Sequence, residues 1–94
     1  MTLKEIITDL ESIDDSLTIC AEKGAAWSDF SIAELHASHL AANQFPLPYF
    51  LEVSVAKSVI SAWSFARGGR IPNLKEKCEA IIYYAENDAY LLPE

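Results

Sequence analysis

The sequence predicts an α+β fold that is mostly helical, with about four helices packed around a central buried helix and a minor antiparallel β-sheet. Apolar residues that recur at helical spacing predict the helices, and short alternating apolar stretches predict the strands. The length adds a third constraint. Because 94 residues with 51% apolar content can bury one core without disulfides or metal, we expect a single domain over residues 1–94.

The first helix is expected at about residues 3–11. Thr2 and Glu5 match a capping box, in which each side chain accepts a hydrogen bond from the other residue's backbone N–H. Apolar residues then follow at the spacing of one helix face: Leu3, Ile6, Ile7 and Leu10. After a turn at residues 14–16, residues 17–20 alternate as in a short strand. Residues 25–29 fit either a returning strand or an irregular loop.

A second helix is expected at about residues 32–43. Ser31 and Glu34 repeat the capping-box pattern, and the residues after them continue at helical spacing. Pro46 and Pro48 break this pattern, because the residue before a proline avoids helical backbone angles. We expect Pro48 to lead into the next helix as an early helical residue.

The central helix is expected over residues 49–67. Apolar side chains cover most of its circumference and leave a narrow stripe of serines and Lys57, which is typical of a helix packed on several sides. Glu52, Lys57 and four serines interrupt the run, which argues against a membrane span. Gly68 and Gly69 should end the helix, because glycine adopts the left-handed conformation at little cost.

The last helix is expected over residues 73–87, with Asn73 as its cap. Its buried face comprises Leu74, Cys78, Ile81, Ile82 and Ala85. Residues 89–92 are expected to form a terminal strand that pairs with the strand at 17–20.

Acidic residues outnumber basic ones 14 to 7, which gives a net charge of −7 and an isoelectric point near 4.6. The excess is concentrated near the start, because residues 1–34 hold eight acids against two bases. Such a surface repels phosphate backbones and anionic lipids and attracts basic proteins. We therefore expect a protein partner, with no nucleic acid and no membrane.

The two cysteines, Cys20 and Cys78, are expected to be free buried thiols in a reducing compartment, although a disulfide between them stays open. The first residues lack the apolar core of a signal peptide. Both features favour a cytoplasmic location.

Histidines and cysteines offer the main candidate chemistry. His36 and His39 lie three residues apart on the expected second helix and could share a metal ion. Cys78 with either histidine could form a nucleophile and base. No catalytic motif surrounds these residues, and the turn at residues 67–70 fits a helix stop between arginines better than a phosphate or RNA contact. We therefore expect a protein that is not an enzyme, without cofactor, metal or small-molecule substrate.

Two groups of residues are candidates for binding a partner. The first is an acidic run at the end of the first helix and in the following turn: Asp9, Glu11, Asp14 and Asp15. Such a patch could steer a basic protein and reject wrong partners, although solvated surface is the simpler explanation. The second combines aromatic side chains with acids: Tyr83, Tyr84, Glu86 and Asp88. Tyrosines beside acids suit an interface, although they are also common as half-buried helix residues.

The closing segment, residues 80–90, has the sequence AIIYYAENDAY, and residues 3–7 have the sequence LKEII. Together they resemble a family of small acidic bacterial domains of unassigned function that end in a similar Tyr-Tyr, Asp-Ala-aromatic pattern. Some such proteins are encoded beside polymorphic toxins and look like immunity proteins, including those of contact-dependent growth inhibition systems. The resemblance implies no catalytic residue.

These features predict a non-enzymatic binding protein, an immunity protein that neutralises a cognate toxin domain, for example a basic nuclease, by direct binding. The alternative is a small structural or regulatory adaptor subunit that self-associates through exposed apolar surface. A small metal-dependent enzyme that uses His36 and His39 is the third hypothesis.

Overall fold

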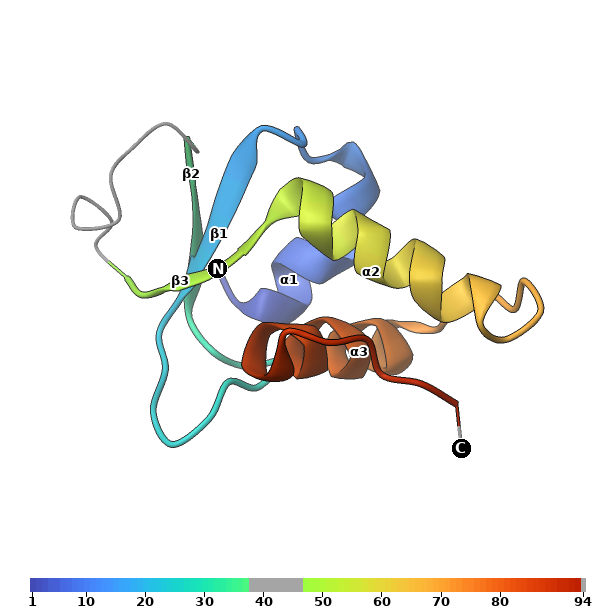
Figure 1. Ribbon diagram of the computed structural model, residues 1–94. Coiled ribbons are helices and arrows are strands. Elements are labelled where there is room, and N and C mark those ends of the chain that lie inside the picture. The colour runs from blue at the N-terminus through green and yellow to red at the C-terminus, as the bar shows by residue number, and fades with distance from the viewer. Residues whose placement is uncertain (38–46, 94) are drawn as a thin grey trace.

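The computed structural model describes residues 1–37 and 47–93. Its elements follow in the order α1 (Leu3–Thr8), the 3₁₀ turn η1 (Leu10–Ser12), β1 (Leu17–Ala21), β2 (Ala33–Ala37), β3 (Tyr49–Glu52), α2 (Val53–Phe65) and α3 (Leu74–Asn87). Figure 1 shows the sheet on one side of the molecule and the helices on the other, with α2 above α3 and α1 between them in this view. The fold is α+β, as the sequence predicts, but helices do not dominate it.

The sheet is antiparallel, with β1 in the centre between β2 and β3. Ile19 stands opposite Leu35 on one side and Leu51 on the other, and the register with β3 shifts between Ile19 and Cys20. Four of the five residues of β1 are buried. This strand therefore confirms the prediction at residues 17–20 and forms the centre of the sheet.

The core is one cluster of buried apolar side chains drawn from the helices and all three strands. Ile6, Ile7 and Ile81 contribute from α1 and α3, and Val59 contributes from α2. The loop between β1 and β2 adds Trp27, whose Nε1 donates a hydrogen bond to the carbonyl oxygen of Ala21 at 3.2 Å. The Trp27 ring meets the ring of Phe50 edge to face, with 4.9 Å between centroids. Residues 25–29 thus belong to an irregular loop.

The predicted capping box at Thr2 and the predicted cap at Asn73 are confirmed, whereas the capping-box match at Ser31 and Glu34 precedes a strand and not a helix. At α1, the Thr2 hydroxyl accepts from the backbone N–H of Glu5, and the Glu5 carboxylate accepts from the Thr2 backbone N–H at 2.9 Å. Asn73 and Glu76 make the same reciprocal pair at α3. Each box satisfies two backbone donors that a helix start leaves without a partner. The predicted first and last helices therefore begin at the expected residues.

The predicted helix at 32–43 is wrong where the structure describes it. Residues 33–37 form β2, and only the part beyond residue 37 lies outside the described residues. The backbone of this segment pairs with β1 in register, and at its first residue the N–H of Ala33 also donates to the carbonyl oxygen of Met1 at 2.8 Å. Tertiary pairing has overridden a local helical pattern.

The central helix begins four residues later than predicted. Residues 49–52 form β3, and Pro48 precedes that strand instead of opening a helix. The Pro48 carbonyl oxygen accepts a hydrogen bond from the N–H of Ala21 at 2.9 Å, which starts the pairing of this segment with β1. Nor is α2 buried on several sides: Val53, Ala56, Val59 and Trp63 are buried, whereas Ser58, Ser61 and Phe65 are exposed. The expected glycine stop is confirmed, because Gly68 and Gly69 have φ values of 69° and 88°.

The described residues form three α-helices, not four, and the predicted strand at 89–92 is wrong. That strand was expected to pair with 17–20, but β2 and β3 occupy both edges of β1. The closing segment instead packs on the helices. The ring centroids of Tyr90 and Tyr84 are 5.3 Å apart, and Arg67 donates a hydrogen bond to the carbonyl oxygen of Leu91. Among the described helices, none is long and apolar enough to cross a membrane.

Candidate functional site

The acidic run extends from the junction of α1 and η1 to the connection between η1 and β1, and all four of its acids are exposed. Two of them have structural partners. The Asp14 carboxylate accepts a hydrogen bond from the backbone N–H of Ser16 at 2.8 Å, and Asp15 forms an ion pair with Lys57. Hydrogen bonds from Ser16 hold the pKa of Asp14 below its ordinary value of 3.8, and Lys57 adds to the effect. Asp14 and Asp15 therefore shape the turn as well as carrying charge.

Lys57 ties this turn to the first half of α2. Its Nζ donates to the carbonyl oxygen of Ile13 at 2.7 Å as well as pairing with Asp15. Lys57 belongs to the polar stripe expected on the central helix, and it contacts the turn before β1.

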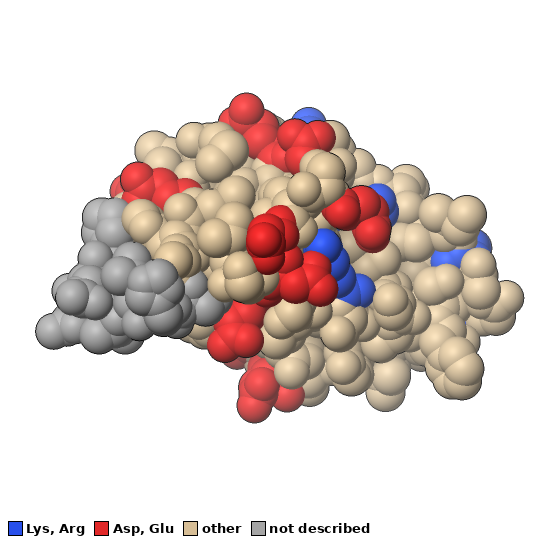
Figure 2. Space-filling model, turned by 90° about the horizontal axis from the view of Figure 1, so that it is seen from above, with Lys and Arg blue, Asp and Glu red and all other residues tan. Residues whose placement is uncertain are grey.

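Asp9 and Glu11 differ from the other two acids. Within the described ranges 1–37 and 47–93, neither side chain forms an ion pair. Their charge is directed at solvent, where it is available to a partner. Figure 2, which views the molecule from above, shows acidic side chains scattered over this face with basic side chains among them.

Glu11 also borders an apolar groove that the sequence analysis did not single out. The groove has a volume of about 510 Å³ and lies between the outer face of α2 and the turn that follows it. Its lining includes Ile60, Phe65, Ile71 and Pro72, together with Lys77 of α3. Phe65 is 89% exposed and Ile71 is 85% exposed. Sequence reasoning missed this site because it treated the helix as buried on several sides.

The second predicted group does not form one surface. Tyr83 and Glu86 line one groove, whereas Tyr84 and Asp88 line another, between α3 and β3. Figure 1 shows α3 along the opposite side of the molecule from the connection between η1 and β1. The two predicted groups therefore lie on segments that are far apart in the fold.

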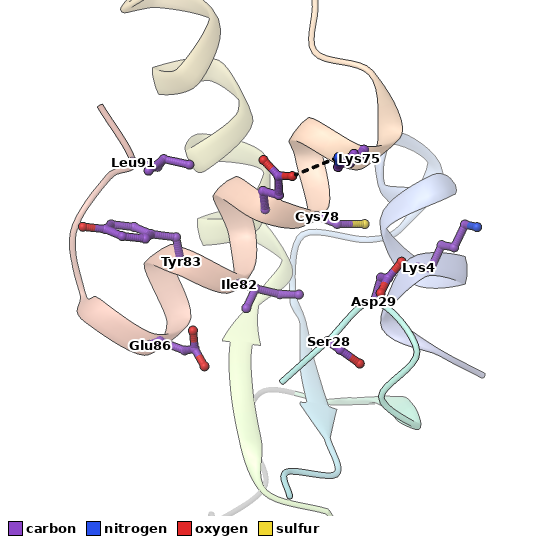
Figure 3. A pocket seen from close by; sticks show the side chains of 10 residues that line it. Lys4, Ser28, Asp29, Lys75, Cys78, Ile82, Tyr83, Glu86 and Leu91 are labelled. Carbon is purple, nitrogen blue, oxygen red and sulfur yellow. Dashed lines mark ion pairs between the residues drawn. The ribbon is translucent and has the colours of Figure 1, made fainter. Parts of the chain in front are cut away.

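The groove with Tyr83 and Glu86 has a volume of about 680 Å³. Figure 3 shows α3 crossing its centre, with Leu91 and Tyr83 on one side and Lys4 and Asp29 on the other. Charged groups of both signs surround a small apolar floor that includes Ile82. This mixture fits no single class of ligand.

Cys78 lines the same groove but is a poor nucleophile. Burial raises the pKa of its thiol above the ordinary value of 9.0, and the charge of Asp29 adds to the effect. The thiol is therefore protonated at neutral pH, and the lining of the groove includes no histidine that could act as its base. Cys20 is likewise buried, and both cysteines are free thiols, as expected.

The metal hypothesis finds no support in the part of the chain that the structure describes. His36 lies on β2, and its Nε2 is 3.2 Å from a carboxylate oxygen of Glu34. His39 lies outside the described residues. No group of three or more potential ligands comes together among residues 1–37 and 47–93.

Arg67 and Arg70 have structural partners. Both guanidinium groups lie over the ring of Trp63, at 4.2 and 4.6 Å from its centroid. Arg67 also donates to the carbonyl oxygen of Trp63, and Arg70 pairs with Glu76 at 2.8 Å. Through these contacts the two arginines pack against the C-terminal end of α2.

Comparison of the chain with protein-family models, with curated proteins and with solved structures finds no match. Of the surfaces described above, the groove beside Glu11 combines one exposed acid with strongly exposed apolar side chains. That combination is typical of a protein-binding surface, since burial of apolar area gives affinity and charge gives selectivity.

Proposed function

We propose that this protein is a non-enzymatic binding protein of the cytoplasm, an immunity protein that neutralises a cognate toxin domain with a basic surface. The observation that carries the proposal is Glu11 at the border of an exposed apolar groove, with Asp9 two residues before it. Both acids are exposed and lie outside the ion pairs of the described residues. The net charge of −7 supports a basic partner. Residues 3–7 and 80–90 resemble a family of small acidic bacterial domains of unassigned function, some of which look like immunity proteins, and this resemblance motivates the choice of a toxin.

The proposed mechanism is direct coverage of the toxin's active site or substrate groove. Exposed acids attract a basic surface over roughly one Debye length, about 8 Å at physiological salt, and so accelerate the encounter. A basic nuclease is a suitable partner, because the groove that binds its phosphate backbone is positive. The acids of this chain then occupy the place of the substrate phosphates.

Co-expression with the neighbouring gene product tests this function. The tagged chain is produced together with the protein encoded immediately upstream in its native locus, and growth and complex formation are measured. We expect that the neighbour alone inhibits growth, and that both growth and a 1:1 complex are recovered when the chain is present. A harmless neighbour that forms no complex would contradict the proposal.

A matched pair of charge reversals tests the role of the acidic run. Glu11→Lys and Glu22→Lys both replace an exposed glutamate and change the net charge by the same amount. We expect Glu11→Lys to slow association with the partner by about 3- to 10-fold at low salt and to weaken its salt dependence, because steering depends on charge near the contact. Equal rates for the two variants would show that the acids beside Glu11 are not involved. Reversals at Asp14 or Asp15 are less suitable, because both side chains hold the turn.

The second candidate is a small adaptor subunit that self-associates. The exposed side chains of Phe65 and Ile71 favour it, since apolar groups of this size gain from mutual burial. Sedimentation equilibrium separates the candidates: an adaptor forms a stable homo-oligomer, whereas the proposed immunity protein is a monomer until its toxin arrives.

A further inference from the structure

We propose that the outer edge of β2 is a docking site for an extended segment of the partner protein, which adds to the sheet as a further antiparallel strand. This inference rests on the proposed function and adds a contact to the surface beside Glu11. Three observations carry it: backbone groups of β2 without a partner, N-terminal residues that already pair with the start of this edge, and the regularity of the strand.

The direction of the backbone groups along β2 follows from the bonds at its first residue. The N–H of Ala33 donates to the carbonyl oxygen of Met1, on the side of β2 away from β1. Successive residues of a strand direct their N–H and C=O groups to alternate edges, so Leu35 and Ala37 direct theirs to the same side as Ala33. Within residues 1–37 and 47–93, these outward groups of Leu35 and Ala37 form no hydrogen bond.

The first residues of the chain show how a strand lies along this edge. Thr2 forms an antiparallel bridge with Ile32, and Met1 accepts the bond from Ala33 at 2.8 Å. In the described chain this pairing reaches only the first residue of β2. A segment in line with Met1 and Thr2 therefore meets the open part of the edge, residues 34–37.

The other edge of the sheet is less suitable for an added strand. β3 has four residues, follows Pro48, and shifts register where it passes Ile19 and Cys20 of β1. Short strands, prolines and irregular register are features that keep sheet edges from pairing with other chains. By contrast, β2 pairs with β1 over five residues without a shift and contains no proline or lysine.

The sheet also favours a particular side chain on the added strand. Leu35 packs against the core and lies in one row with Ile19 and Leu51. A residue opposite Leu35 extends this row, which favours valine, isoleucine or leucine at that position. The backbone of the occupant then supplies the hydrogen bonds and this residue supplies the apolar contact, as is usual for strand addition.

A second copy of this chain fits the edge less well than the partner does. Two copies each carry a net charge of −7, so long-range repulsion opposes their approach. A partner with a basic surface is attracted by the same charge. We therefore assign the edge to the partner of the proposed function.

Hydrogen exchange on the wild type tests the inference directly. Amide exchange is measured by NMR on the free protein and on its complex with the upstream gene product. In the free protein, the amides of Leu35 and Ala37 should exchange faster than those of Glu34 and His36, which face β1. In the complex, we expect exchange at Leu35 and Ala37 to slow by at least about 100-fold, because both amides then donate to the added strand.

A matched pair of variants gives a second readout. Ala37→Pro removes one outward donor, whereas Ala37→Ser keeps it and also has a small side chain. Proline is tolerated on edge strands where its nitrogen faces outward, so circular dichroism and thermal midpoints should match the wild type. By surface plasmon resonance, we expect Ala37→Pro to raise Kd by at least about 10-fold and Ala37→Ser to stay within about 2-fold, because proline loses a bond and obstructs the added strand.

The outcomes separate the inference from the proposed function. Unchanged exchange at Leu35 and Ala37 in a complex that forms, or equal affinity of the two variants, would overturn the inference and leave the proposed function intact. Protection of both amides in the free protein that disappears on dilution would assign the edge to a second copy and overturn it as well. Failure of the wild type to bind the neighbour would overturn the proposed function, and the inference with it.

Discussion

At the scale of single residues, the start of α3 shows how local chemistry sets both structure and titration. Asn73 and Glu76 exchange hydrogen bonds at 2.9 and 3.0 Å, and Arg70 pairs with the same glutamate. The hydrogen bond from the Asn73 backbone lowers the pKa of Glu76 below its ordinary value of 4.5, and Arg70 lowers it further. The folded state therefore favours the ionised form of Glu76.

This linkage predicts a difference in acid stability between the wild type and Glu76→Gln. The folded pKa lies below the unfolded one, so the contribution is present above about pH 4.5 and is lost as pH falls through the folded value. Glutamine keeps the acceptor oxygen but does not titrate. Urea unfolding from pH 7 to pH 3 should show the wild type as more stable at pH 7, with the difference shrinking below pH 4.5.

Glu79→Gln is the control for this prediction, because it removes a charge from the same helix without touching the cap. A Glu76→Gln variant whose stability runs parallel to the wild type over the whole pH range would contradict the assignment.

At the scale of elements, β1 explains why two predicted helical segments are strands. Its five residues offer two edges, and segments 33–37 and 49–52 supply the missing hydrogen bonds. A buried strand with an unpaired edge leaves donors and acceptors without partners, which costs more than a helical pattern gains. The closing segment is left without a strand to join and lies against α2 and α3 through Arg67 and Tyr90.

The closing segment should depend on Arg67. Its guanidinium donates to the carbonyl oxygens of Trp63 and Leu91, at 3.0 and 3.3 Å, and so joins α2 to the chain end. We expect Arg67→Ala to release residues 88–93 from the end of α2 and to speed chymotryptic cleavage after Tyr90 by several-fold, because local opening controls such cleavage.

Arg70→Ala is the matched control, since Arg70 covers the same tryptophan ring but has its hydrogen bond with Glu76. If both variants were cleaved at the same rate, stacking on Trp63 and not the bond to Leu91 would hold the segment.

At the scale of the whole molecule, all helices and strands share one cluster of buried side chains. The fluorescence of Trp27 depends on the loop between β1 and β2, and that of Trp63 depends on the C-terminal end of α2. A shared core makes these regions depend on one another. This arrangement agrees with a single domain, which remains a prediction that unfolding can test.

We predict that tryptophan fluorescence and far-UV circular dichroism follow one coincident transition in urea. Ile19→Ala, in the centre of the sheet and fully buried, should move both curves to lower urea by the same amount, with a loss of about 2–5 kcal/mol. Separate transitions for the two signals would show that the helices and the sheet unfold independently.

What the sequence determined by itself was local. The capping box at Thr2, the helix cap at Asn73 and the glycine stop after α2 depend on residues close together in the chain, and all were predicted. The charge excess follows from composition alone. These features need no knowledge of distant segments, because their hydrogen bonds and backbone angles are satisfied within a few residues.

Tertiary structure decided the rest. Segments 33–37 and 49–52 carry helical patterns, yet become strands because β1 lies beside them. The exposure of Phe65 and Ile71 depends on which face of α2 meets the sheet and α3, and Lys57 meets Asp15 from 42 residues away. Pairing between distant segments is set by the free energy of the whole core, which no local window of sequence contains.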